Sequence, residues 1–201
     1  MPRPSRIGTR EQILATALEL FLAQGYEATS LRAIAEHLEI TKAALYYHFP
    51  AKEQLVVELT RPFLNELADL VAKARAEDPQ RRPDRRLVLL TAYLDALVTH
   101  RRVISLLAQN PATQNHPDVG LRLRNLIESY TTEIAGPDAR EEDKVRVACA
   151  IGVINAVATG PITDPIRAKP IILGAALAAL DSDPLAEHPA EPGRRAGRDS
   201  S

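Results

Sequence analysis

The sequence contains very little of several residue types that mark particular classes of protein. Among 201 residues there are one cysteine, one methionine, no tryptophan, five tyrosines and three phenylalanines. The single cysteine, Cys149, excludes a disulfide framework, and its apolar surroundings in the sequence favour a small buried side chain. The formal net charge is −1. No overall charge therefore attracts the chain to nucleic acid, and any such attraction must be local.

Membrane spans, catalytic motifs and metal-ligand spacings are also missing from the sequence. The longest apolar stretches, 145–160 and 171–180, are too short to cross a bilayer, and no apolar segment of a secretory signal follows the basic N-terminus. We therefore expect a cytoplasmic protein. The motifs G-x-S-x-G, G-x-G-x-x-G, H-E-x-x-H and the P-loop do not occur, so the sequence predicts no enzyme and no cofactor. The histidines lack metal-ligand spacing; they are His37, His48, His100, His116 and His188.

Apolar residues recur every three or four positions along most of the chain, whereas strand-like alternation is scarce. This spacing is typical of amphipathic helices, and it predicts an all-α protein. We expect about nine helices, three short ones followed by six more. The predicted ranges are 11–24, 31–38, 41–47, 52–76, 85–100, 103–109, 117–134, 139–159 and 170–181.

Capping residues and prolines set the expected helix ends. Thr9 is a predicted N-cap of the first helix, and Gly25 is expected to end it in a left-handed conformation. Thr41 is the predicted N-cap of the third helix. Pro62 lies inside the long fourth helix and should kink it. Pro170 would sit badly deeper inside a helix, so we expect the last helix to begin near it.

The second and third helices, with a tight turn between them and the first helix behind them, have the layout of a helix-turn-helix unit. We expect Ala44, Leu45 and Phe49 to form the buried side of the third helix. Small, hydroxyl and aromatic side chains on its other side can approach base edges and phosphates. These outward residues are Thr41, Lys42, Ala43, Tyr46, Tyr47 and His48.

Residues 9–55, "TREQILATALELFLAQGYEATSLRAIAEHLEITKAALYYHFPAKEQL", resemble the DNA-binding domain of the TetR family of bacterial repressors. The resemblance implies a helix-turn-helix DNA-binding domain at 1–52 and a helical ligand-binding and dimerisation domain at 53–183. The second part is similar to the family in architecture only. Composition predicts a disordered tail at 184–201. The matching positions are Gly25, Tyr26, Thr29, Ile34, Ala35, Leu45, Tyr46, His48, Phe49, Lys52, Glu53 and Leu55.

The resemblance also implies which residues contact DNA. Those residues are Thr29 and Ser30 at the start of the second helix, Thr41, Lys42 and Ala43 at the bases, Tyr46, Tyr47 and His48 at the flanking backbone, and Lys52 at a phosphate. We also infer a basic arm that includes Arg3, Arg6 and Arg10. Relatives usually have glycine in the turn where this chain has Glu39. If that position needs a positive φ, Glu39 costs about 1 kcal/mol and brings a negative charge near DNA.

The C-terminal part of the sequence suggests a dimer and a ligand cavity. The helices at about 139–159 and 170–181 are apolar nearly all round, so they are either core or half of a four-helix bundle with a second copy. A homodimer suits a near-palindromic DNA operator. Polar residues on apolar helix faces are candidates to line a cavity for a small, largely apolar or neutral effector. They are Tyr93, Gln109, Asn110, His116, Tyr130, Asn155 and Thr159.

Two functions remain open from the sequence. The first is a TetR-like, ligand-responsive regulator that represses transcription and is released from its operator by the effector. The second is a helical adaptor that binds a protein partner through its apolar C-terminal helices. Only the first predicts sequence-dependent, salt-sensitive DNA binding.

Overall fold

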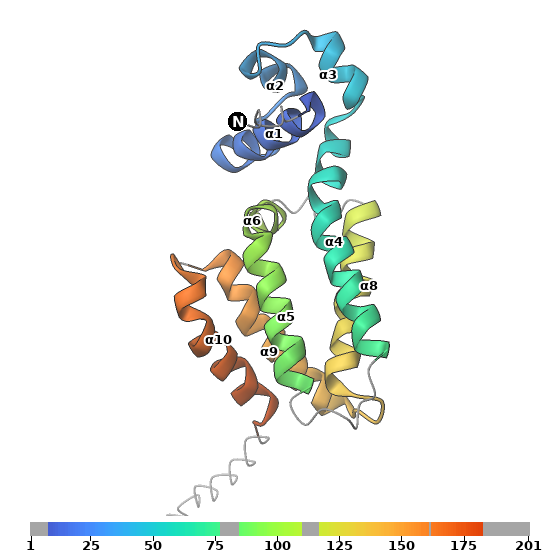
Figure 1. Cartoon of the computed structure of the whole chain (residues 1–201), viewed down its shortest axis with the longest axis vertical. Helices are drawn as coiled ribbons and strands as arrows, with labels where there is room; N and C mark the ends of the chain where they lie inside the picture. The colour runs from blue at the N-terminus through green and yellow to red at the C-terminus, as the bar shows by residue number, and fades with distance from the viewer. Residues whose placement is uncertain (1–7, 77–84, 110–116, 161, 183–201) are drawn as a thin grey trace, which may run out of the picture.

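Helices account for all of the regular structure in the part of the chain that the structure describes. The structure is a computed structural model, and it describes residues 8–76, 85–109, 117–160 and 162–182. The predicted all-α class is confirmed there, with nine helices and no strand. These are α1 (Thr9–Gln24), α2 (Leu31–His37), α3 (Lys42–His48), α4 (Lys52–Ala76), α5 (Arg85–Thr99), α6 (Arg101–Gln109), α8 (Pro117–Ala135), α9 (Glu141–Thr159) and α10 (Pro165–Leu180) (Figure 1).

The helices form two groups that share α4. The three short helices α1, α2 and α3 lie together at one end of the molecule, and α4 starts beside them and runs the length of the rest (Figure 1). Below them, α4 packs against α8 and α5, α9 packs against α5, α6 and α8, and α10 lies on α9 and α5. The only larger contact of the first group with the second, apart from α4, is between α1 and α6. We call α1, α2 and α3 the reading unit.

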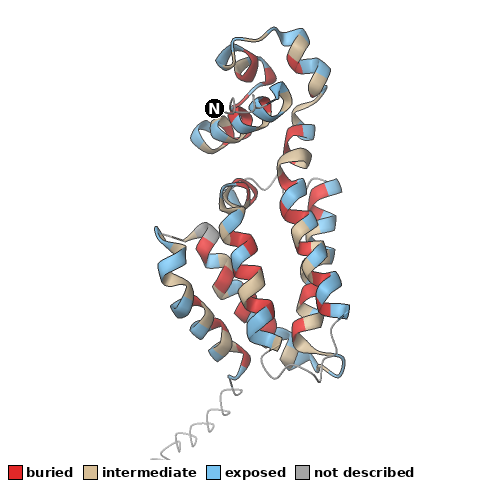
Figure 2. Ribbon diagram, viewed as in Figure 1, coloured by how far each residue is buried: buried red, intermediate tan, exposed pale blue. Residues whose placement is uncertain are grey.

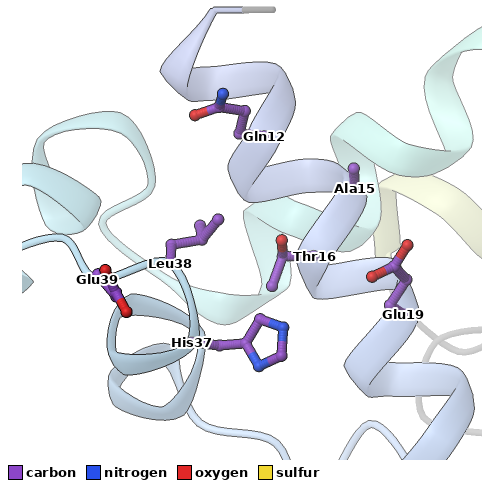
Figure 3. A pocket seen from close by; sticks show the side chains of 7 residues that line it. All are labelled: Gln12, Ala15, Thr16, Glu19, His37, Leu38 and Glu39. Carbon is purple, nitrogen blue, oxygen red and sulfur yellow. The ribbon is translucent and has the colours of Figure 1, made fainter.

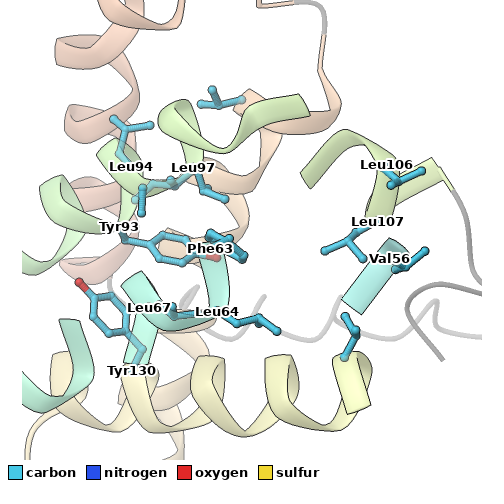
Figure 4. Packing of buried hydrophobic residues seen from close by; sticks show 14 of the residues in the cluster. Val56, Phe63, Leu64, Leu67, Tyr93, Leu94, Leu97, Leu106, Leu107 and Tyr130 are labelled. Carbon is cyan, nitrogen blue, oxygen red and sulfur yellow. The ribbon is translucent and has the colours of Figure 1, made fainter. Parts of the chain in front are cut away.

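The interior of the second group is filled by large apolar side chains from α4, α5, α6 and α8 (Figure 4). Phe63 and Leu67 of α4 are buried against Leu94 and Leu97 of α5, as their helical spacing predicts. Burying side chains of this size is the main favourable contribution to folding. The amphipathic pattern in the sequence therefore places the core correctly.

Two helix ends differ from the prediction. Gly8, not Thr9, is the N-cap residue of α1, and Thr9 is already helical. The last helix begins at Pro165 rather than near Pro170, because the Asp164 side chain accepts a hydrogen bond from the Arg167 N–H at 3.0 Å and Pro165 occupies the first helical position. Proline fits there, since its missing N–H would have no helical partner. The helix then continues through Pro170.

Cys149 is exposed on α9, contrary to the prediction of a buried thiol. The apolar run around it is real, but Val145, Ala148 and Gly152 on the same helix are exposed with it. The helix α10 likewise consists mostly of exposed and half-buried residues (Figure 2). Periodicity alone cannot show this, because an uncovered apolar face and a buried one have the same sequence pattern. Among the described helices, none is long and apolar enough to cross a bilayer.

Candidate nucleic-acid interface

The reading unit is held together by α1 and by the short connection after it. Phe21 and Ala17 of α1 are buried, and Tyr26 packs edge-on against Phe21 with ring centroids 5.1 Å apart. Gly25 ends α1 at φ 91° and ψ 153°, a conformation open almost only to glycine. Gly25 is thus the predicted C-cap with a positive φ, although its ψ is extended rather than left-handed helical.

Ser30 and Thr29 have different roles at the start of α2. The Ser30 side chain accepts a hydrogen bond from the Ala33 N–H at 3.0 Å and is exposed, so it caps the helix. Thr29 is 1% exposed, and its hydroxyl donates to the Gly25 carbonyl at 2.8 Å. Its backbone N–H donates to the Tyr26 carbonyl at 3.2 Å. Its hydroxyl and its amide are therefore both used internally in this structure, and the contact of Thr29 with DNA stays a prediction.

The turn between α2 and α3 requires a positive φ, and Glu39 supplies it. Glu39 has φ 54°, and it is the one residue other than glycine with a positive φ in the described part of the chain. The Ile40 N–H donates to the Ala35 carbonyl at 3.0 Å, and the Glu39 N–H donates to the Glu36 carbonyl at 3.2 Å. These two bonds make a Schellman motif, in which glycine is usual at the Glu39 position. Glu39 keeps the glycine-type turn at a cost in strain.

The helix α3 has one buried side and one exposed side, as predicted. The Thr41 side chain caps it by accepting from the Ala44 N–H at 3.1 Å. Leu45 is fully buried, and Phe49, which follows the helix, is 1% exposed. The opposite side presents polar and aromatic groups to solvent: Thr41, Lys42, Ala43, Tyr46 and Tyr47 are exposed and His48 is partly buried.

The two tyrosines of α3 are the largest exposed groups of the reading unit. Tyr47 is 84% exposed and Tyr46 is 49% exposed. The Tyr47 ring meets the His48 ring edge-on, with centroids 5.3 Å apart. The hydroxyls of the two tyrosines are therefore accessible, and a tyrosine hydroxyl is a good donor to phosphate oxygen.

Lys52, at the first position of α4, ties that helix to the reading unit. Its ammonium donates to the Tyr26 carbonyl at 2.9 Å and lies 4.1 Å from the centroid of the Tyr26 ring. Burial, together with the charges of Glu53 and Glu27, raises the pKa of Tyr26 to about 12. The ring therefore stays neutral and offers its face to the cation. Lys52 thus has a structural role that the sequence did not reveal.

Arg10 does not belong to a free basic arm. It lies in the first turn of α1, pairs with Glu58 of α4 at 2.5 Å, and sits 5.1 Å from the centroid of the Phe49 ring. Glu58 also pairs with Arg61. Arg3 and Arg6 lie outside the described residues. The contacts of Arg10 therefore fix the reading unit on α4.

A shallow groove of about 440 Å³ lies between α1 and the end of α2 (Figure 3). Glu19 and Glu39 lie on opposite sides of it, with His37 and Thr16 between them. Two carboxylates in the walls repel phosphate, so this face is unsuited to the DNA backbone. The exposed side of α3 is the better candidate for that contact.

Three of the predicted effector-binding residues come together in the interior of the second helix group. The Tyr93 hydroxyl donates to Asn155 Oδ1 at 2.9 Å, and the Tyr93 and Tyr130 rings lie 5.6 Å apart (Figure 4). The Tyr130 hydroxyl donates to the Leu89 carbonyl at 2.5 Å. Burial is the largest cause that raises the pKa of both phenols, to about 12 for Tyr93, so both are neutral hydrogen-bonding groups.

Gln109 is the one remaining effector candidate whose side chain lies in the described part of the chain, and it does not join this cluster. Gln109 is exposed at the C-terminal end of α6, contrary to the expectation that it lines an interior. A polar residue in the last turn of a short helix can face solvent without breaking the apolar pattern. Asn110, His116 and the side chain of Thr159 lie outside the described residues. In the described ranges, no group of three histidine, cysteine, aspartate or glutamate side chains could hold a metal ion.

Sequence reasoning missed Arg32 and Glu36 on the outward side of α2. The Arg32 Nε donates to Glu36 Oε1 at 2.6 Å. The signal was available, because an arginine and a glutamate four residues apart on a predicted helix lie one turn apart on the same face.

A small helical unit with an exposed recognition-type helix, followed by a separate helical group, defines a helix-turn-helix regulator. A model of "Bacterial regulatory proteins, tetR family" matches residues 13–59. The regulator TcmR of Streptomyces glaucescens is 47% identical over 49 residues, which are 24% of this chain and 22% of that protein. The repressor KstR2 of Rhodococcus jostii is 32% identical over 96 residues, 48% of this chain and 47% of that protein. The chain thus spans less than half the length of these curated relatives.

Solved structures extend the likeness to the whole fold. AmtR of Mycobacterium smegmatis superposes with a TM-score of 0.68 at 24% identity, over 92% of this chain and 91% of that one. The TetR family regulator PfmR of Thermus thermophilus superposes with a TM-score of 0.66 at 22% identity, over 84% of this chain and 96% of that one. Residues 13–59 thus belong to the TetR family of transcriptional regulators, which is not a family of enzymes, and the chain as a whole has the fold of TetR family structures.

Proposed function

We propose that this protein is a homodimeric repressor that binds a near-palindromic DNA operator and is released by a small, largely apolar or neutral molecule. The proposal rests on one observation, which is that α3 has a buried side and an exposed side. Leu45 and Phe49 are buried, whereas Lys42, Tyr46 and Tyr47 are exposed on the other side. A helix exposed in this way at the end of a molecule fits the DNA major groove, which has room for one helix.

The proposed DNA contacts follow from position and chemistry. Lys42 and Ala43 stand at the front of α3, where a small side chain allows the backbone near base edges, and the Thr41 hydroxyl can donate to DNA while it caps the helix. Tyr46, Tyr47 and His48 are proposed to contact the flanking phosphates. Ser30 and Lys52 are proposed further phosphate contacts; an ammonium has three donors, and one bond to the Tyr26 carbonyl leaves others for DNA.

The proposed dimer interface is the uncovered side of α9 and α10. Val145 of α9 is 56% exposed, and Ile166 and Ile171 of α10 are 75% and 76% exposed. A Cβ added to Gly152 or Gly174 would meet nothing within 4 Å, so open space lies beyond these two glycines on the same two helices. Large exposed apolar groups next to small residues allow close approach of two more helices, and a four-helix bundle with a second copy supplies them.

The proposed effector site is the interior around Tyr93, Tyr130 and Asn155. The contacts within this cluster join neutral groups, two phenols and one amide, and apolar side chains of α4 and α5 belong to the same buried core. Such an environment favours a largely apolar or neutral ligand. Release of DNA requires a ligand that binds one conformation of the dimer more tightly than the other. The favoured conformation must be the one in which the spacing of the two α3 helices does not suit DNA.

The domain division and the direction of regulation remain parts of the proposal. We assign 1–52 to DNA binding and 53–183 to ligand binding and dimerisation; the predicted tail at 184–201 lies outside the described residues. Relatives named as repressors support repression, among them KstR2 and the "Probable acrEF/envCD operon repressor" of Escherichia coli. A cytoplasmic location follows from the proposed contact with chromosomal DNA.

Binding of the purified protein to its own upstream intergenic DNA tests the proposal. Fluorescence anisotropy should show tight binding to this duplex, weaker binding to a shuffled duplex of equal length, and a steep loss of affinity with salt. Replacement of the exposed Tyr47 by alanine should weaken binding, while Val88→Ala, at a distant exposed position on α5, should not. Equal, salt-insensitive binding to both duplexes would favour the helical adaptor instead.

A further inference from the structure

The outward side of α2 carries an ion pair that the fold does not need. The Arg32 Nε and Glu36 Oε1 atoms are 2.6 Å apart, and the two side chains are 67% and 60% exposed. Pairs this exposed add little to the stability of a protein, because solvent screens them and two long side chains lose freedom. Stability therefore does not account for the pair, and we consider a role in function instead.

The carboxylate of Glu36 interacts with a cation from each helix of the helix-turn-helix. The hydrogen bond from Arg32, followed by the charge of Arg32, lowers the pKa of Glu36, and the charge of Lys42 acts in the same direction. Lys42 is the first residue of α3. Glu36 thus partly neutralises two of the cations that the DNA-facing surface offers to phosphates.

The bond between the two side chains also orients the guanidinium. Glu36 is bound through Nε, so the two terminal nitrogens of Arg32 are not used in this bond. A guanidinium held in a fixed plane can donate two parallel hydrogen bonds to a correctly placed acceptor pair, such as O6 and N7 of guanine. A phosphate offers a similar pair of acceptors only where two of its oxygens lie in the plane of the guanidinium.

We propose that Glu36 is a specificity-determining positioning residue, which holds Arg32 so that it binds DNA only where the operator presents matching acceptors. On other sequences the fixed carboxylate competes with phosphate for Arg32, which weakens non-specific binding. This inference rests on the proposed DNA-binding function. The inference gives a role to the negative charge of Glu36 on the DNA-binding surface, where a negative charge by itself would weaken binding to DNA.

The test compares Glu36→Gln with a matched loss of charge at Glu39. Both are exposed glutamates of the reading unit, but only Glu36 is bonded to Arg32. Anisotropy titrations at several salt concentrations would use a duplex from the upstream intergenic region and a shuffled duplex. The full set is wild type, Glu36→Gln, Glu39→Gln, Arg32→Ala and the Arg32→Ala/Glu36→Gln double variant, each with a thermal unfolding curve to show that it is folded.

Glu36→Gln should bind the shuffled duplex more tightly, by roughly tenfold per subunit at about 0.1 M salt, with a log–log salt slope steeper by about 0.9 for each arginine released to phosphate. The ratio of operator to shuffled affinity should fall. Glu39→Gln should shift both duplexes alike and keep that ratio. In the Arg32→Ala background, Glu36→Gln should have no further effect on the ratio.

Two results would overturn the inference. The first is a Glu36→Gln variant that behaves like Glu39→Gln, which would reduce Glu36 to a general repulsive charge. The second is a loss of specificity that persists without Arg32. If the wild-type protein itself shows no sequence-dependent, salt-sensitive binding, the proposed DNA-binding function fails, and that failure is distinguishable from both.

Discussion

Replacement of Glu39 by glycine should stabilise the protein while leaving the α2–α3 turn unchanged. Glu39 has φ 54°, within the left-handed region that disfavours residues with a Cβ atom. The hydrogen bonds of the turn come from the backbone of Glu39 and Ile40, so glycine keeps both of them. The side chain is exposed, and its removal opens no cavity.

The size of the effect follows from two opposing contributions. A residue with a Cβ in the left-handed helical region costs about 1–2 kcal/mol relative to its preferred conformations. Glycine relieves this strain, but it also increases the conformational entropy of the unfolded chain, at a cost of about 0.5–1 kcal/mol. We therefore expect Glu39→Gly to raise the free energy of unfolding by up to about 1.5 kcal/mol, or by up to roughly 3–6 °C in Tm for a chain of this length.

Chemical denaturation at one fixed protein concentration measures this change, because dimerisation would otherwise shift the midpoint. Glu39→Ala is the matched control: it removes the same charge but keeps the Cβ, so its unfolding free energy should stay within about 0.5 kcal/mol of wild type. Equal stabilisation by glycine and alanine would show that charge, not backbone strain, limits stability at this position. Destabilisation by glycine would refute the inference that backbone strain at Glu39 lowers the stability of the protein.

Three further predictions concern DNA binding, assembly and release. Lys52→Ala should weaken binding to all duplexes alike and reduce the salt slope by about one unit, whereas Lys42→Ala should change which operator bases are preferred; titration of a panel of operator variants separates the two. Ile171→Asp should give a folded monomer by light scattering with normal circular dichroism, while Leu121→Asp, at an exposed site on α8, should remain a dimer. Pro62→Ala should stiffen α4 and reduce effector-induced release of DNA; unchanged release would exclude Pro62 as a hinge.

The reading unit could be predicted closely because local signals in it agree. The cap residues Ser30 and Thr41, the glycine at position 25 and the apolar spacing around Leu45 all point to the same three helices. The resemblance left open whether position 39 needs a positive φ, and the structure shows that it does. Features of this kind depend only on a few residues that are neighbours in the sequence.

Contacts between residues far apart in the sequence could not be predicted. Lys52 reaches the carbonyl of a residue 26 positions earlier, and Arg10 pairs with Glu58 on another helix. Polar side chains such as these have several possible partners, and only the packed fold selects one. The exposure of Cys149 was missed for a related reason: which side of an apolar helix is covered depends on what packs there.

The path of α4 explains how an event in the interior could alter DNA binding. Its first residue, Lys52, is bound to the reading unit, Glu58 is paired with Arg10 of α1, and Phe63 packs in the apolar interior that also holds Tyr93. A close-packed interior cannot take up the volume of a ligand without moving its walls. Under the proposed mechanism, a ligand that displaces α4 at Phe63 would carry the reading unit with it through two charged contacts. In a two-fold dimer, the same displacement in both subunits changes the separation of the two α3 helices, and the spacing of successive major grooves tolerates little change.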